Sequence, residues 1–492
     1  MASRSDSVSP LRPQGRSGPV PTTGISHPLT PATDTPTSEW RWITGHAATV
    51  LVGQLAVMAF GVTDTVLAGR YAESALAALS VGSAYYISVF VALMGIMQAL
   101  LPVWAELHGA RRQAEVGHSL RQALYLCLTT TAVGTFALLN PGPLLRWASV
   151  PAEMHGPVSD YLAILSLALG PALLFRMFST LNQALGKPRL VTVLQVGALA
   201  LKIPLSWWLT FGGGGLAAMG LQGCAWATVV VNVGMLGVAL VLLRSQDLYR
   251  PYAIWRRLEP PDWARLRQYT RLGVPAGLAI LVEVTSFTLM ALFIARMGQT
   301  ASAAHQVASN LAAILYMVPL AFAIATSART SYWLGAAQPQ RAQRAAVTGL
   351  ILGMSLAILF AALTALLREP LALAYTSRPA VAATAATLLG WIALYHCADA
   401  LQALCVFLLR CYRISVAPLV VYCLLLWGLG LSGGYWLAYI GGGPIAAMGR
   451  PEAFWITSAV ALLGVSGIFS VMLWHAMRSS RAVRACASHP DP

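Results

Sequence analysis

Apolar residues form long, almost unbroken stretches along this chain, in place of the short alternating runs of a soluble core. Each stretch spans about 20 residues or more, the length that an α-helix needs to cross the hydrocarbon core of a bilayer. The pattern predicts twelve transmembrane helices, at 43–68, 79–104, 119–140, 157–183, 188–211, 219–243, 272–296, 303–327, 346–367, 381–409, 415–440 and 454–476. The chain is therefore predicted to be an all-α membrane protein, with the long second and tenth stretches tilted or kinked.

The stretches also divide the chain into parts. Residues 1–42 are rich in Ser, Thr and Pro and have no apolar core, which is typical of a disordered tail. Residues 43–243 form a predicted N-lobe and residues 272–477 a predicted C-lobe, each with six helices. A linker at 244–271 joins the lobes, and a short basic tail follows at 478–492.

The net charge of +15 comes from basic residues that gather on one side of the predicted membrane. They lie in the connections that follow an even-numbered helix. The connections that follow an odd-numbered helix carry few basic residues. The basic set comprises Arg111, Arg112, Lys187, Arg189, Arg244, Arg250, Arg256, Arg257, Arg265, Arg267, Arg271, Arg329, Arg341, Arg344, Arg410 and Arg413. Because basic loops stay in the cytoplasm, this asymmetry predicts an inner-membrane protein with both termini cytoplasmic. The loops are expected to contact anionic lipid headgroups, with no nucleic acid partner.

The chain resembles itself at a shift of 226 residues. Residues 77–81 (Ala-Ala-Leu-Ser-Val) align with 303–307 (Ala-Ala-His-Gln-Val), and 107–110 (Leu-His-Gly-Ala) align with 333–336 (Trp-Leu-Gly-Ala) without a gap between them. Each copy holds six helices, an even number, so both copies insert in the same direction. We therefore predict two lobes related by a pseudo-twofold axis along the membrane normal, with a cavity between them.

Three carboxylates lie inside predicted membrane helices: Asp64, Glu283 and Asp399. The chain has only 17 acidic residues, and each charge at bilayer depth costs about 3 kcal/mol or more. Such residues usually face a bundle interior and mark the path of an ion or a substrate. The Gly-Lys-Ser/Thr phosphate loop does not occur, so the sequence predicts a gradient-driven transporter with no cofactor and no ATPase subunit.

Several motifs occur in the order and spacing of one known family. They are 62–65 (Val-Thr-Asp-Thr), 107–111 (Leu-His-Gly-Ala-Arg), 283–287 (Glu-Val-Thr-Ser-Phe), 303–308 (Ala-Ala-His-Gln-Val-Ala) and 395–399 (Tyr-His-Cys-Ala-Asp). On these motifs the chain, from about residue 43 to 476, resembles the multidrug and toxic compound extrusion (MATE) family in its NorM-like branch. The resemblance implies two six-helix lobes and Na⁺- or H⁺-coupled export of cationic, often aromatic, compounds.

The resemblance also implies roles for single residues. Glu283 and Asp399 match the family's C-lobe cation-site carboxylates, and Tyr395 matches their aromatic neighbour, a set that would hold Na⁺ in a sodium-coupled member. Asp64 matches the N-lobe carboxylate that is linked to proton coupling and drug release. The chain departs from the family in the fifth helix, where relatives often carry two asparagines and this chain reads Lys-Ile-Pro-Leu-Ser from Lys202 onward.

Helical spacing places three further residues beside Glu283. Ser286, Phe287 and Met290 follow Glu283 at i+3, i+4 and i+7, and so share its helix face. This face combines a carboxylate, an aromatic ring and an adaptable thioether, a combination that suits a flat organic cation.

Gln402 lies three residues after Asp399, and Tyr395 lies four residues before it, so these three share one face of the tenth helix. That face can hold a cation through a carboxylate, a phenol and ring electrons. Burial disfavours an ionised carboxylate and a nearby cation favours it, so one site can hold a proton or a cation in turn. The alternative is that the carboxylates only hydrogen-bond to neighbouring helices.

Lys202 lies in the middle of its helix, too deep to reach the headgroups easily. We hypothesise that it pairs with Asp64, the only acid inside a membrane helix of the same lobe, and that it competes there with the coupling cation. The alternative is a lysine that faces a wet cavity or is neutral through burial. Arg176, near the end of its own helix, is expected to reach the headgroups instead.

The sequence therefore favours a monomeric secondary antiporter that exports small organic cations in exchange for Na⁺ or H⁺. The alternatives are a flippase or exporter of lipid-linked or polar metabolites, an ion-coupled importer and a membrane-embedded enzyme. A flippase for pyrophosphate-linked substrates should line its cavity with several Lys and Arg, and here mainly Lys202 qualifies. An enzyme would need a nucleophile–base set or a metal set; the sequence contains neither pattern, so no enzymatic activity is expected.

Overall fold

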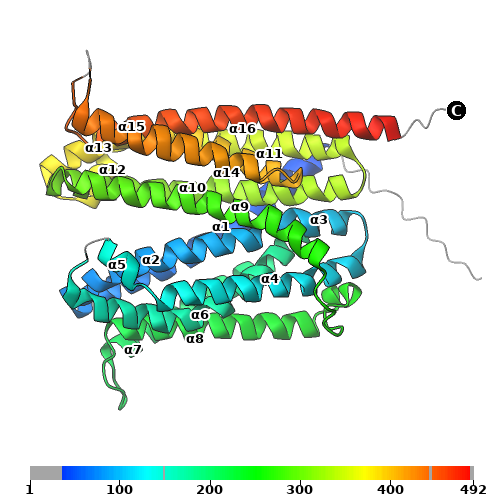
Figure 1. Ribbon diagram of the computed structural model, residues 1–492, viewed down its shortest axis with the longest axis horizontal. Coiled ribbons are helices and arrows are strands. Elements are labelled where there is room, and N and C mark those ends of the chain that lie inside the picture. Colours follow the sequence, from blue (N-terminus) through cyan, green and yellow to red (C-terminus); the bar gives the residue numbers. More distant parts are fainter. Residues whose placement is uncertain (1–35, 148–149, 443–445, 488–492) are drawn as a thin grey trace, which may run out of the picture.

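The computed structural model describes residues 36–147, 150–442 and 446–487, and almost all of them are helical. Within these ranges, twelve helices are long enough and apolar enough to cross a membrane, at the places that the hydrophobic pattern predicts. The helices lie roughly parallel in two layers, one from each half of the chain (Figure 1). The chain is thus an all-α membrane protein with two lobes of six membrane helices.

The first lobe contains six membrane helices, the second of which is broken. Its elements are α1 (Pro36–Tyr71), α2 (Glu73–Gln98), α3 (Leu101–Gly109), α4 (Gln113–Leu139), α5 (Gly142–Trp147), α6 (Ala152–Ala184), α7 (Arg189–Phe211) and α8 (Leu221–Ser245). The long second stretch is kinked as expected, because α2 ends at Gln98 and α3 starts with Pro102 in its first turn. Proline lacks the N–H that would continue the helical ladder, so the break falls just before it.

The second lobe repeats this arrangement. Its elements are α9 (Trp263–Ala295), α10 (Gln299–Gly335), α11 (Pro339–Leu366), α12 (Arg368–Tyr375), α13 (Pro379–Cys411), α14 (Val416–Tyr422), a π-helical stretch (Cys423–Ser432), α15 (Gly433–Tyr435), a second π-helical stretch (Trp436–Ile440) and α16 (Glu452–Ala487). The eleventh membrane helix therefore combines α-helical and π-helical turns, and wide turns of this kind often occur at functional sites.

The two terminal segments differ from the sequence prediction. α1 begins at Pro36, inside the segment 1–42 that is assigned above to a disordered tail, and α16 continues to Ala487, inside the predicted tail at 478–492. Hydropathy detects only the part of a helix that lipid surrounds, so it misses polar turns that extend beyond the membrane. The rest of both predicted tails lies outside the described residues.

The observed linker is shorter than the predicted range 244–271, because the next helix starts inside that range. α9 begins at Trp263, where the side chain of Asp262 accepts hydrogen bonds from the backbone N–H groups of Ala264 and Arg265. An aspartate at this position satisfies donors that the first turn of a helix leaves free. The connection between the lobes is therefore reduced to a 3₁₀ turn at Asp247–Tyr252 and an irregular segment up to Asp262.

The contacts between the lobes have the symmetry that the repeat predicts. α1 packs against α10, and α2 packs against α9. In the repeat, α9 corresponds to α1, and α10 corresponds to α2 and α3. A twofold rotation therefore exchanges these two contacts, as expected for two copies that insert in the same direction.

One crossing shows the symmetry at atomic detail. A Cβ atom on Gly109, at the end of α3, would lie 1.9 Å from the carbonyl oxygen of Tyr332 on α10. A Cβ atom on Gly335, at the end of α10, would lie 1.9 Å from the carbonyl oxygen of Glu106 on α3. Gly109 and Glu106 correspond to Gly335 and Tyr332 at the shift of 226, so each lobe makes the same contact with the other.

This crossing lies at the end of the bundle that carries the α8–α9 connection and the C-terminal end of α16, here called the linker end (Figure 1). Two ion pairs reinforce it. Arg413 Nη2 lies 2.5 Å from Glu106 Oε2, and Arg329 Nε lies 2.8 Å from Glu39 Oε2 on α1. Each pair joins one lobe to the other, so the lobes are held together at the linker end.

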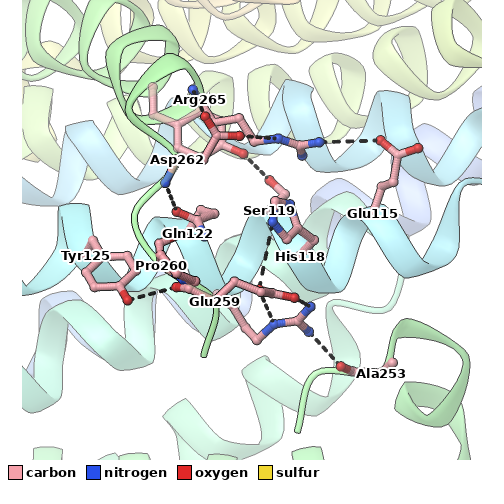
Figure 2. Close-up of polar contacts among 12 residues, drawn as sticks. Glu115, His118, Ser119, Gln122, Tyr125, Ala253, Glu259, Pro260, Asp262 and Arg265 are labelled. Atoms are coloured by element: carbon pink, nitrogen blue, oxygen red, sulfur yellow. Dashed lines mark hydrogen bonds and ion pairs between the residues drawn. The ribbon is translucent and has the colours of Figure 1, made fainter. Parts of the chain in front are cut away.

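The segment between the lobes is bound to α4 along much of its length (Figure 2). Arg121 donates to both carboxylate oxygens of Glu259, at 2.9 and 2.6 Å, and to the carbonyl oxygen of Ala253 at 2.7 Å. The side-chain amide of Gln122 donates to the carbonyl of Pro260 and accepts from the backbone N–H of Asp262. The hydrogen bond from Arg121 lowers the pKa of Glu259, so this contact stays charge-assisted at neutral pH.

We predict that Gly109→Ala and Gly335→Ala each weaken closure of the linker end. A methyl group at either position overlaps a backbone carbonyl, and overpacking of this kind costs about 1–3 kcal/mol. Spin labels on Gln113 and Gln338, in a cysteine-free background, should report longer distances in both variants. Gly234→Ala on α8, whose Cβ would meet nothing within 4 Å, serves as the control. An unchanged distance distribution in both glycine variants would contradict the role of this crossing.

We also predict that Glu259→Gln loosens the linker. The substitution removes the charge from a two-pronged hydrogen bond, so trypsin should cleave at Arg256 and Arg257 faster than in the wild-type protein. Asp247→Asn is the matched control, because its ion pair with Arg250 is largely exposed and such pairs contribute little. Equal cleavage rates for the wild type and Glu259→Gln would show that the charge does not hold the segment.

Candidate cation site

Two carboxylates of the second lobe share a single buried amide. Gln402 Nε2, on α13, donates to Asp399 Oδ1 at 2.9 Å and to Glu283 Oε1, on α9, at 3.5 Å. The hydroxyl of Tyr422 on α14 donates to Gln402 Oε1. Gln402 is fully buried, Asp399 is buried and Glu283 is half-buried. The sequence predicts these three side chains as site residues, and the fold brings them together.

The electrostatics of this arrangement favour a bound cation. Two ionised carboxylates beside one amide repel each other strongly in a medium of low dielectric constant. Within the described residues, neither Glu283 nor Asp399 has a Lys or Arg nitrogen within the 4.0 Å of an ion pair. A proton or a mobile cation between the acids relieves the repulsion. Oxygen ligands of this kind suit Na⁺ as well as an organic ammonium.

Three aromatic rings form a wall next to the acids. Phe287 lies 5.9 Å from Tyr395 and 6.2 Å from Trp455 of α16, and Tyr395 lies 5.5 Å from Trp455, all measured between ring centroids. All three pairs are edge contacts, a geometry in which ring quadrupoles attract. The rings therefore hold each other in place, and Phe287, which is half-buried, keeps part of its surface free.

Met290 and Ser286, both predicted as site residues, differ in burial. Met290 is buried, and its sulfur accepts a 3.8 Å hydrogen bond from the hydroxyl of Ser458 on α16. It therefore packs inside the second lobe. Ser286 is half-buried on the same helix, one turn from Glu283.

Two arginines that the sequence assigns to the membrane surface are buried instead. Arg410, placed above among the basic loop residues, lies within α13 at 2% exposure, with its guanidinium carbon 4.5 Å from the centroid of the Phe407 ring. Its charge acts on Glu283. Arg176 of α6, expected to reach the headgroups, is 7% exposed. Arg410 lies just after its apolar stretch and Arg176 lies inside its own, so position along the chain does not reveal their burial.

Asp64 and Lys202 form a separate pair within the first lobe. Lys202 Nζ, on α7, lies 2.9 Å from Asp64 Oδ1 on α1, which confirms the hypothesised ion pair. The same nitrogen donates to the hydroxyl of Thr228 on α8 at 2.7 Å. Lys202 has no exposed surface, and the side chain of Asp64 is 11% exposed. A lysine this deeply buried requires such a partner.

A cavity of about 570 Å³ lies between the lobes at the linker end. Charged residues of both lobes line it, including Glu106, Arg112, Glu115, Arg265 and Arg413. This cavity is distinct from the acid pair on α9 and α13. It lies between the lobes, but its walls are polar and its acids are already paired with arginines.

Sequence reasoning misses three contributors to the site: Trp455, Tyr422 and Arg410. Trp455 and Tyr422 lie on the twelfth and eleventh membrane helices, and no spacing within one helix links them to the acids. Their only sequence signal is a polar aromatic side chain within an apolar stretch. Such a residue is as common in the interfacial belt as in a site, so the signal is not specific.

Comparison with known proteins agrees with this architecture. The MatE family model matches residues 50–208 and 275–436, one segment in each lobe. The chain is 38% identical over 445 residues to the probable multidrug resistance protein NorM of Aromatoleum aromaticum, covering 89% of this chain and 95% of that protein. It is 34% identical over 390 residues to the multidrug resistance protein PmpM of Pseudomonas aeruginosa, covering 79% and 82% of the two chains.

Solved structures share the fold. The bent form of the Vibrio cholerae MATE transporter VcmN superposes with a TM-score of 0.79 at 18% identity, over 91% of this chain and 99% of that one. The eukaryotic MATE transporter AtDTX14 gives 0.79 at 17% identity, over 91% and 99%. These likenesses establish the fold, and the closer sequence relatives establish the family. The chain belongs to the MatE family of multidrug efflux transporters, among its NorM-like members.

Proposed function

We propose that this protein is a secondary antiporter of the inner membrane that exports organic cations in exchange for Na⁺ or H⁺. The observation that carries the proposal is the pair of carboxylates, Glu283 and Asp399, joined by the amide of Gln402 and lacking a basic partner within ion-pair distance among the described residues. Two acids at membrane depth without an ion-paired base favour uptake of a cation, and several kinds of cation can compete for them.

Competition at one site is enough for exchange. If the coupling ion and the cargo cannot occupy the acids together, arrival of one releases the other. Each occupant then favours a different arrangement of the lobes, which couples the two fluxes. The glycine crossing closes the linker end, which the distribution of basic residues assigns to the cytoplasm. Loading from the cytoplasm therefore requires the lobes to separate at Gly109 and Gly335.

The aromatic wall supports a cationic and flat cargo. A cation over the face of an aromatic ring gains about 0.5–2 kcal/mol, depending on how dry the site is. Phe287 combines a partly free ring with a position one turn from Glu283, so the charge and the ring system of one cargo molecule can be recognised together. The relatives named above are described as multidrug resistance proteins, which is consistent with broad recognition by rings and charge.

The remaining parts of the proposal follow from the same chemistry. An ion gradient supplies the energy, so the protein needs no ATPase subunit and no bound cofactor. Both lobes and both candidate acid sites lie in one chain, so a monomer is sufficient. Lipid headgroups are the expected partners of the arginines at the linker end.

We predict that Glu283→Gln and Asp399→Asn each reduce gradient-driven ethidium efflux about tenfold or more. Each removes a charged interaction of about 1.5–3 kcal/mol with the bound cation. The measurement is efflux from loaded proteoliposomes, with Na⁺ and pH gradients imposed separately to identify the coupling ion. Glu369→Gln, an exposed acid on α12, is the control. Efflux at the wild-type rate in either acid variant would refute the role of the pair.

We predict that Phe287→Leu raises the dissociation constant of ethidium by about threefold to tenfold. Leucine keeps most of the apolar volume but removes the ring face, so the cation–π contribution of about 1 kcal/mol is lost. Fluorescence titration of the purified protein measures this directly. Phe136→Leu, at a 71% exposed position on α4, should leave binding unchanged. Equal losses in both variants would point to a general effect on the fold.

A further inference from the structure

The first lobe contains a cluster of cation-binding groups, and the side chain of Lys202 lies at its centre. Around Lys202 Nζ lie a carboxylate oxygen of Asp64 at 2.9 Å, the hydroxyl of Thr228 at 2.7 Å and the ring of Phe60, whose centroid is 5.7 Å away. A carboxylate, a hydroxyl and an aromatic face are also the groups that hold a free sodium ion or an organic ammonium.

The cluster is oriented toward the lysine. The Thr228 hydroxyl donates its own proton to the carbonyl oxygen of Cys224 at 3.0 Å, which leaves an oxygen lone pair for Lys202. An ammonium group has three donors and no acceptor, so the ion pair, the hydroxyl and the ring account for its surroundings. Within this arrangement the charge of Asp64 is balanced without any exchangeable ion.

A tethered cation is difficult for a mobile one to displace. The lysine is part of α7, so its concentration at Asp64 is fixed by the fold, and even short flexible tethers give effective concentrations of about millimolar. Displacing it would also leave an ammonium group with no exposed surface and no counter-ion, a state that is strongly unfavourable. The two lobes therefore differ in charge balance, because the acids of the second lobe have no lysine or arginine within ion-pair distance among the described residues.

We infer that Lys202 is a resident counter-ion that occupies the cation site of the first lobe, so that exchange of cargo and coupling ion is confined to Glu283 and Asp399. The inference rests on the proposed function and refines it. Removing the lysine should convert Asp64 into an exchangeable cation site. The variant would then hold one exchangeable cation site in each lobe.

The experiment counts cations on purified protein in which Glu283→Gln and Asp399→Asn silence the second lobe. Bound ²²Na⁺ and protons taken up are measured together, so the result does not depend on which ion enters. With Lys202 present, this background should bind no ²²Na⁺ that Asp64→Asn removes. Proton uptake is compared only among variants that lack Lys202, because the lysine can itself lose a proton when its counter-ion is removed. Adding Lys202→Asn should create about one bound cation per protein, since one carboxylate holds one charge. Adding Asp64→Asn to that variant should abolish it.

A second substitution keeps the test independent of one variant's folding. Lys202→Met removes the ammonium but keeps a long side chain, and it should give the same count as Lys202→Asn. Tyr161 and Cys224 are further titratable side chains near Asp64. Because the gain must disappear with Asp64→Asn, neither of them can be its source. Binding of ²²Na⁺ at Asp64 while Lys202 is present, or no gain in the Lys202 variants, would overturn the inference. The count needs no transport, so failure of wild-type efflux would refute the proposed function without affecting this result.

Discussion

Compensation of charge inside the bilayer is the constraint on which this structure depends. An uncompensated ion at that depth is too costly to retain, so every buried acid needs a partner. Even Glu39, which precedes the apolar part of α1, is held by Arg329 and by the indole N–H of Trp333. Asp64 is held by Lys202. Glu283 and Asp399 share the neutral amide of Gln402, and this is where the proposed exchange needs an external cation.

The scaffold around these groups follows from duplication of a six-helix unit. Two copies with the same orientation form a closed pair when a twofold rotation exchanges their contacts. The packing of α1 on α10 and of α2 on α9 satisfies this rule. So does the crossing at Gly109 and Gly335, where only glycine allows the two backbones to touch. The close approach makes closure of the linker end an all-or-none contact, which is suited to a protein that alternates between two arrangements.

Much of this organisation could be predicted from the sequence. Twelve helices, two lobes and the pairing of Lys202 with Asp64 follow from apolar length, internal repetition and the cost of a lone buried charge. The ends of the helices could not be predicted, because the polar turns of α1 and α9 carry no hydropathy signal. The burial of Arg410 and Arg176 was also missed, since the chain position of an arginine does not distinguish a loop from a polar core. Trp455 enters the site from a helix distant in sequence, and only the tertiary fold reveals it.

The placement of the two acid sites within single lobes limits how coupling can work. Asp64, Lys202 and Thr228 all belong to the first lobe, and Glu283, Gln402 and Asp399 all belong to the second. If the lobes move as rigid bodies, the distances within each site stay constant during the cycle. What changes is which side of the membrane reaches the site. A site whose charge is already balanced by its own lobe gains nothing from that change in access, whereas a site with unbalanced charge takes up a cation from whichever side is open. In the proposed antiport, the direction of exchange is then set by the gradients on the two sides.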